Sequence, residues 1–202
     1  MFIRYLFWLG AAVLALIPVM SPAVAADARS AAGQLLVANP DMPDPRFAET
    51  VIYMCRHDDE GAFGLVLNRR VGDMDLSRVL ESFKVDKAAE ATGSIEVRHG
   101  GPVEATRGYL LHSDEFAARG SVCRDSGVAV SASLDVLAAL AAGQGPRRAI
   151  LFLGYAGWGP GQLDDEIAHK GWSVVPTDAK TLFDSNIDDM WRRSMSRRGV
   201  DL

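Results

Sequence analysis

Short apolar runs, separated by glycine, proline or charged residues, recur along the chain and predict a protein built mainly from β-strands. The runs are rich in β-branched and aromatic side chains, which favour strands. Most are joined by short turns such as Gly100-Gly101-Pro102, so we expect hairpins rather than strand–helix–strand units. The expected strands cover residues 33–38, 50–55, 62–68, 95–99, 108–112, 128–130, 149–155 and 172–175.

Apolar residues at helical spacing predict a few helices among these strands. Leu76, Leu80 and Phe83 share one face of a helix over residues 73–83, for which Asp75 is a suitable N-cap. Further helices are expected at residues 134–142, 160–170, 178–183 and 187–198. Strands cluster early and are linked mostly by short turns. This order predicts a single α+β domain in which helices pack on an antiparallel or mixed sheet.

The first 25 residues have the pattern of a signal peptide. Arg4 precedes an apolar run over residues 5–19, and Ala23-Val24-Ala25 is a small-x-small cleavage signature. The run is shorter than the roughly 18–20 residues of a membrane-spanning helix, so we expect no stable membrane span after cleavage. We predict a signal peptide at 1–25 and an exported, periplasmic domain at 26–202. The alternatives are an uncleaved anchor and a misassigned start in a cytosolic protein.

Composition and charge narrow the class of protein. Hydrophobic residues make up 49% of the chain and charged residues 23%, as in ordinary folded proteins. The formal net charge of −5 argues against nucleic acid as a partner, because phosphate contacts need clustered Lys and Arg. Cys55 ends an apolar run and nothing around Cys123 marks a bridge partner, so we predict two unpaired thiols. No C-x-x-C motif supports a zinc ribbon or a redox pair.

Motifs for metals, cofactors and nucleophilic catalysis are absent from the sequence. Residues 57–60, His-Asp-Asp-Glu, lack the alternation of a calcium loop and are interpreted as a solvated hairpin tip. Asp165 and His169 are four apart on a predicted helix and are interpreted as an exposed side-chain pair. The chain contains neither G-x-S-x-G nor H-E-x-x-H, and its glycines do not follow a P-loop or dinucleotide spacing. We therefore expect no metal and no cofactor.

Four polar residues around the Gly-Gly-Pro turn are the candidates for catalysis. His112 with Asp114 would form an acid–base pair, Arg107 with His112 would bind an anion, and His99 brackets the turn from its other side. The alternative is that these residues anchor the turn and have only a structural role, and we favour it because such turns need polar anchors.

The strand at 149–155 is followed by a glycine-rich turn and a helix that opens at Pro160. Closely spaced glycines admit another molecule to the backbone, and free helix N–H groups favour a small anionic ligand. Trp158 would supply a flat apolar face for a ligand or a protein partner. The alternative is a tight corner filled by Trp158, without a site. The candidate surface consists of Gly154, Tyr155, Gly157, Trp158, Gly159 and Gly161.

Several motifs, in the same order, resemble the AlgH/YqgE family. They are GAFGLVLNR (61–69), GGPVEATRGYLLHSDEF (100–116), LGYAGWGPGQLDDEI (153–167) and PTDAKTLFD (176–184), followed by Trp191. The resemblance covers nearly all of the chain after residue 25. It implies a complex α+β fold with a barrel-like, mostly antiparallel sheet and flanking helices. The family is named after a proposed regulator of alginate synthesis, and the resemblance implies no established activity and no cofactor.

The sequence departs from this family at the export signal, at Arg70 in place of proline, and at its shorter C-terminal tail. Export would separate the protein from DNA, so we expect an exported, non-enzymatic binding or regulatory module. Two alternatives remain: a cytoplasmic transcriptional regulator with a misassigned N-terminus, and a hydrolase-type enzyme with its site around the Gly-Gly-Pro turn.

Overall fold

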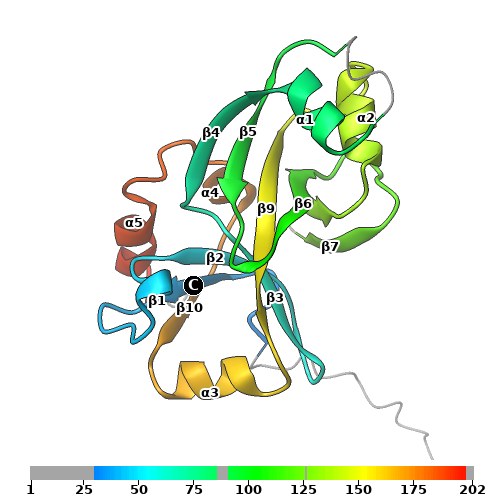
Figure 1. The fold of residues 1–202 in the computed structure, drawn as a ribbon. Coiled ribbons are helices and arrows are strands. Elements are labelled where there is room, and N and C mark those ends of the chain that lie inside the picture. The colour runs from blue at the N-terminus through cyan, green and yellow to red at the C-terminus, as the bar shows by residue number, and fades with distance from the viewer. Residues whose placement is uncertain (1–29, 86–90, 126, 199–202) are drawn as a thin grey trace, which may run out of the picture.

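The computed structural model describes residues 30–85, 91–125 and 127–198, and its central element is strand β9 (Ala149–Trp158). β9 is the yellow strand that runs through the middle of the molecule in Figure 1. Its C-terminal end pairs antiparallel with β3 (Gly61–Val66). Its N-terminal half pairs antiparallel with β6 (Val103–Ser113) along one edge and parallel with β5 (Ser94–His99) along the other. β9 therefore joins two groups of strands into one sheet.

The described strands form a ten-stranded sheet with the order β10-β1-β2-β3-β9-β6-β8-β7, and β5 carries β4 as its other neighbour. The two ends of this order, β10 and β7, do not pair with each other, so the sheet is open rather than a closed barrel. The α+β class and the mostly antiparallel sheet are confirmed. The other strands are β1 (Leu35–Ala38), β2 (Val51–Asp58), β4 (Arg70–Asp75), β7 (Ser121–Asp125), β8 (Val128–Ser131) and β10 (Trp172–Val175).

Helices cover the sheet at three places. α1 (Leu76–Ser82) and α2 (Asp135–Ala141) lie together at the end of the molecule that carries β4 and β5 (Figure 1). α3 (Gln162–Ala168) lies at the opposite end, after β9. α4 (Ala179–Leu182) and α5 (Met190–Ser196) follow β10, and α5 contacts β1 and β2. A short 3-10 turn, η1 (Pro45–Phe47), interrupts the loop between β1 and β2.

Strand β1 and the first five residues of β2 are buried, with core on both faces, which explains their continuous apolar runs. Leu35 and Val37 belong to the largest core cluster, whereas Leu36 and Ala38 face a second cluster that contains Trp158 and Trp172. Successive side chains of a strand point to opposite faces. A strand with core on both sides therefore shows no alternation of apolar and polar residues.

Strands β4 and β7 were not predicted from the sequence. Both lie at the sheet edge, and most of their residues are exposed. They therefore lack the apolar pattern by which buried strands are found. The hairpin between β2 and β3 is confirmed, but β2 continues to Asp58 and only Asp59 and Glu60 separate the strands.

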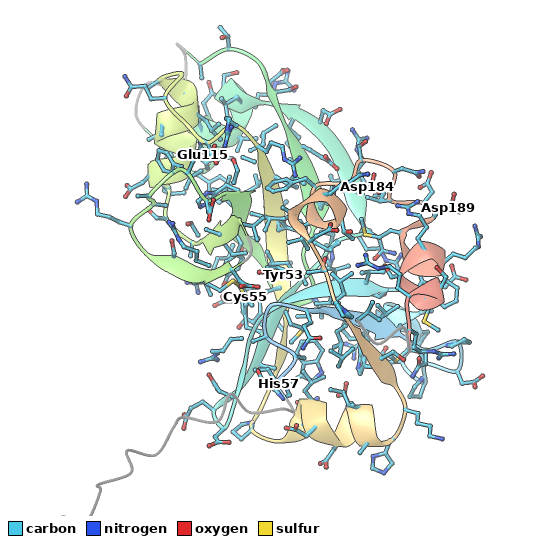
Figure 2. The ribbon with its side chains drawn as sticks, turned by 180° about the vertical axis from the view of Figure 1, so that it is seen from behind. Tyr53, Cys55, His57, Glu115, Asp184 and Asp189 are labelled. Carbon is cyan, nitrogen blue, oxygen red and sulfur yellow. A yellow bond between two sulfur atoms is a disulfide. The ribbon has the colours of Figure 1, made fainter. Side chains whose placement is uncertain are left out.

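Cys55 and Cys123 form a disulfide, so the prediction of two unpaired thiols is wrong. Cys55 lies on β2 and Cys123 on β7, with their Cα atoms 5.5 Å apart (Figure 2 labels Cys55). The bond joins the β7 end of the sheet to a strand in its other half. The disulfide thus links two strands that are not hydrogen-bonded neighbours in the sheet. The prediction failed because β7 itself was not recognised as a strand.

The predicted signal peptide lies outside the described residues, as do residues 86–90, 126 and 199–202. Among the helices that the structure describes, none has both the length and the apolar character needed to cross a membrane.

Removing the disulfide should weaken the whole domain. We expect the double variant Cys55→Ala/Cys123→Ala to lose about 2–4 kcal/mol of unfolding free energy, because the bond closes a long loop in the unfolded chain. Urea unfolding followed by circular dichroism measures this loss. The wild-type protein in reductant should unfold at the same urea concentration as the variant. Equal midpoints for the oxidised and reduced wild-type protein would contradict the prediction.

Candidate functional site

A cleft of about 490 Å³ lies between the loop that carries η1 and helix α3. Its apolar walls include three aromatic rings, those of Phe47, Trp158 and Trp172. Phe47 contacts Trp172 edge to face with ring centroids 5.5 Å apart, and Trp172 contacts Trp158 in the same way at 6.1 Å. The polar side chains along the cleft are Asp44, Arg46, Gln162, Asp165, Glu166 and His169.

Glu166 fixes both tryptophans of the cleft. The indole N–H of Trp158 donates to Glu166 Oε2 at 3.0 Å, and that of Trp172 donates to the same oxygen at 2.8 Å. Gln162 donates to the other carboxylate oxygen at 2.9 Å. Hydrogen bonds from such donors fix the orientation of a carboxylate. The wall of the cleft is therefore rigid, with a negative charge close to two aromatic rings.

The loop before η1 is held against the end of α3 by Asn39. Its side-chain N–H donates to the Lys170 carbonyl at 2.7 Å, and its amide oxygen accepts from Ser173 Oγ at 2.7 Å. In the sequence, residues 39–45 only connect the predicted strands at 33–38 and 50–55, and they contain three prolines. No residue type in it indicated a site, and only the tertiary contact with α3 makes it a wall of the cleft.

Acidic groups predominate among the charges of the cleft. Arg46 is paired with Asp44 through both carboxylate oxygens, at 2.6–3.1 Å. This hydrogen bonding lowers the pKa of Asp44 and raises that of Arg46. The carboxylate of Asp165 makes no hydrogen bond or ion pair with any side chain in the described residues. The cleft thus presents uncompensated negative charge.

The six residues of the predicted glycine surface do not all line the cleft. Gly157 and Trp158 line the cleft, and Trp158 is 8% exposed and therefore largely buried. Tyr155 points into the main core, where its ring lies 4.8 Å from that of Phe63. Gly159 and Gly161 form the turn into α3 and are not among the residues that line the cleft.

Gly154 has an architectural role instead. Its φ of +73° lies in the left-handed region, and a Cβ there would come within 2.5 Å of the Gly101 carbonyl oxygen. Gly100 and Gly101 in turn lie against the backbone of Gly154 and Tyr155, which leaves no room for their own Cβ atoms. The Gly-Gly-Pro turn and the middle of β9 therefore cross in backbone contact. Gly154 and Tyr155 thus form part of a tightly packed corner, as the alternative interpretation of the glycine turn proposed, and not part of a binding surface.

The four catalytic candidates do not converge on one site. His112 on β6 pairs with Ala149, whereas His99 on β5 pairs with Leu153, and these strands flank opposite edges of β9. Ala149 and Leu153 are four residues apart on β9, which separates His112 and His99 by ~13 Å along that strand. Arg107 binds Glu104 and lies over the ring of Tyr109. Asp114 follows the end of β6.

His112 is fully buried and its ring nitrogens are occupied. Its Nε2 lies 2.9 Å from Ser131 Oγ, and its Nδ1 lies 3.0 Å from the Ser113 carbonyl oxygen. A carbonyl only accepts, so Nδ1 carries the proton and Ser131 donates to Nε2. Burial lowers the pKa of His112. A serine and a histidine thus meet as in a hydrolase, but both side chains are sealed from solvent.

The segment His57-Asp58-Asp59-Glu60 is not a solvated tip throughout. The His57 side chain, labelled in Figure 2, is 6% exposed. Its Nδ1 accepts from the Ala31 N–H, and its Nε2 lies 3.3 Å from Asp164 Oδ2. His57 therefore ties the start of the described chain to α3.

No cluster of three or more potential metal ligands occurs in the described ranges. His169 bonds the Asp165 backbone carbonyl rather than its carboxylate, so the predicted side-chain pair is wrong.

The fold and cleft define a class: an open, mostly antiparallel α+β domain with an aromatic, acidic cleft of ligand size. Residues 35–202 match the model of the family described as AlgH-like, and the chain belongs to that family. The resemblance seen in the sequence motifs is thereby confirmed.

Relatives and solved structures agree with this assignment. A UPF0301 protein of Nitrobacter hamburgensis is 45% identical over 179 residues, covering 84% of this chain and 82% of its own. One of Beijerinckia indica is 44% identical over 176 residues, covering 84% and 86%. The solution structure of the AlgH protein from Pseudomonas aeruginosa aligns with a TM-score of 0.69 at 38% identity, over 84% of this chain and 89% of that one. A crystal structure from Corynebacterium diphtheriae shares the fold, with a TM-score of 0.64 at 24% identity over 85% and 88% of the two chains.

The buried His112 should make the fold sensitive to acid. Burial lowers its pKa below 6.5, so the unfolded chain takes up a proton that the folded protein refuses. We expect the free energy of unfolding to be fully maintained above about pH 6.5 and to fall as the pH is lowered below it. Urea unfolding at a series of pH values measures this. In His112→Asn the fall should be shallower, and an unchanged slope would show that His112 is not responsible.

Proposed function

We propose that this protein is an exported binding module that holds a small ligand in the cleft between the η1 loop and α3. The observation that carries the proposal is the cleft itself, with three aromatic rings and a carboxylate fixed by two indole N–H groups. Its volume of about 490 Å³ lies in the range of small-molecule sites. A preformed, rigid wall reduces the entropy that a ligand loses on binding.

Export is supported by two independent features of the chain. The first is the signal-like pattern of residues 1–25, with its small-x-small motif before Ala26. The second is the Cys55–Cys123 disulfide, since such bonds persist in oxidising compartments and are rare in the reducing cytoplasm. A periplasmic location accounts for both features.

The two alternative functions have less support. A hydrolase built around the Gly-Gly-Pro turn would need substrate access to His112, but His112 and its partner Ser131 are both fully buried. A cytoplasmic regulator that contacts DNA would need a basic surface, and the formal charge of the chain is −5. A binding role requires only the open cleft.

Intact mass and N-terminal sequencing of the protein from cell fractions test the export proposal. We expect the periplasmic fraction to contain a chain that begins at Ala26 and is two hydrogen masses lighter than its reduced form. A cytosolic chain that keeps Met1 and two free thiols would overturn this part of the proposal.

Titration of the ¹⁵N-labelled protein with phenol tests whether the cleft admits a small molecule. We expect saturable shifts in the indole N–H signals of Trp158 and Trp172, because both rings line the cleft. Trp191 is the internal control, since its indole donates to the Ala38 carbonyl at 2.7 Å and lines no part of the cleft. Equal shifts for all three tryptophans, or none, would show that the cleft is not a binding site.

A further inference from the structure

We infer that the cleft binds a small organic cation, an ammonium group carried on a compact apolar body. This inference rests on the proposed binding role of the cleft and names its ligand class. It replaces the anionic ligand that the glycine turn suggested. Aromatic faces beside uncompensated carboxylates are the chemistry that recognises alkylated ammonium groups, through cation–π attraction and charge.

The aromatic part of the site is a connected series of rings. Trp172 contacts Phe47 on one side and Trp158 on the other, at centroid distances of 5.5 and 6.1 Å. Trp158 is held in place by its hydrogen bond to Glu166 and by burial in the second core cluster. The rings are thus fixed by the protein and line the same cavity, where Trp158 is 8% and Trp172 3% exposed and Phe47 is half-buried.

After the Asp44–Arg46 pair is set aside, the remaining charged side chains of the cleft are the carboxylates of Asp165 and Glu166. The charge of Arg46 is neutralised by its two-oxygen pairing with Asp44. Glu166 receives only neutral donors, namely two indoles and the amide of Gln162. Asp165 lines the cleft and its carboxylate has no cationic partner among the described residues. Neither carboxylate is therefore paired with a cation of the protein in the described residues.

The start of α3 gives no support for an anion. The helix has seven residues, and Asp164 and Asp165 occupy its first turn. The N–H of Gly159 is already bonded to Gln162 Oε1 at 3.2 Å, and that of Asp165 to the Gly161 carbonyl at 3.1 Å. An anion would meet like charges and find these donors taken, whereas a cation meets favourable charge.

Three probes of nearly the same shape separate charge from size. They are choline, its neutral isostere 3,3-dimethyl-1-butanol, and the anion 3,3-dimethylbutanoate. Each is titrated into the oxidised, ¹⁵N-labelled protein while the indole N–H signals of Trp158, Trp172 and Trp191 are followed. We expect choline to shift the first two signals saturably and to bind about tenfold more tightly than the neutral isostere, with the anion weakest.

Two matched variants test the role of the acidic side chains. Asp165→Asn should weaken choline binding about three- to tenfold and leave binding of the neutral isostere unchanged. Asp164→Asn removes the same charge from the same helix, but Asp164 faces His57 and lies outside the cleft, so choline binding should be preserved. Chemical shifts elsewhere in the spectrum report whether each variant is folded.

The outcomes distinguish this inference from the proposed function. If all three probes bind equally at Trp158 and Trp172, the cleft is a binding site but the inference of a cationic ligand is overturned. Tighter binding of the anion overturns it as well, as does a failure of choline to shift these signals while phenol does so. If neither choline nor phenol affects them, the proposed function fails together with the inference.

Discussion

The contact on which the rest of this fold depends is the backbone crossing between the Gly-Gly-Pro turn and the middle of β9. Gly100 and Gly101 lie directly against Gly154 and Tyr155, and Gly154 adopts a left-handed conformation there. Side chains at these positions would force the two segments apart. On one side of the crossing β9 pairs with β5 and β6, and on the other with β3. The crossing lets one strand serve both halves of the sheet.

The cleft is a consequence of this arrangement. Beyond the crossing, β9 ends at Trp158 and the chain turns into α3, which brings Glu166 back to the indole of Trp158. Trp172 on β10 bonds to the same carboxylate oxygen, and the loop between β1 and β2 completes the wall with Phe47. Segments far apart in the sequence thus meet around one carboxylate. Because the indoles of Trp158 and Trp172 both donate to Glu166, this carboxylate connects the end of β9 to β10.

How much of the site followed from the sequence differs from residue to residue. Trp158 and Gly157 belonged to the predicted surface and do line the cleft. Gly154 and Tyr155 belonged to it too, but Gly154 allows close backbone contact with Gly101, and the ring of Tyr155 packs against Phe63 in the core. Phe47, Glu166 and Trp172 were missed. A lone Phe in a proline-rich loop and a Glu on a short helix carry no local signal, because their roles arise from contacts across the fold.

The sequence by itself determined the strands with buried apolar runs, the α+β class and the family, since these depend on local periodicity and on motifs in order. Only the tertiary structure decided which edge strands exist, that Cys55 meets Cys123, and that His112 and His99 stay apart. Edge strands such as β7 are exposed and polar, so their sequence resembles a loop. Long-range pairing is set by the register of the whole sheet, which no short stretch of residues encodes.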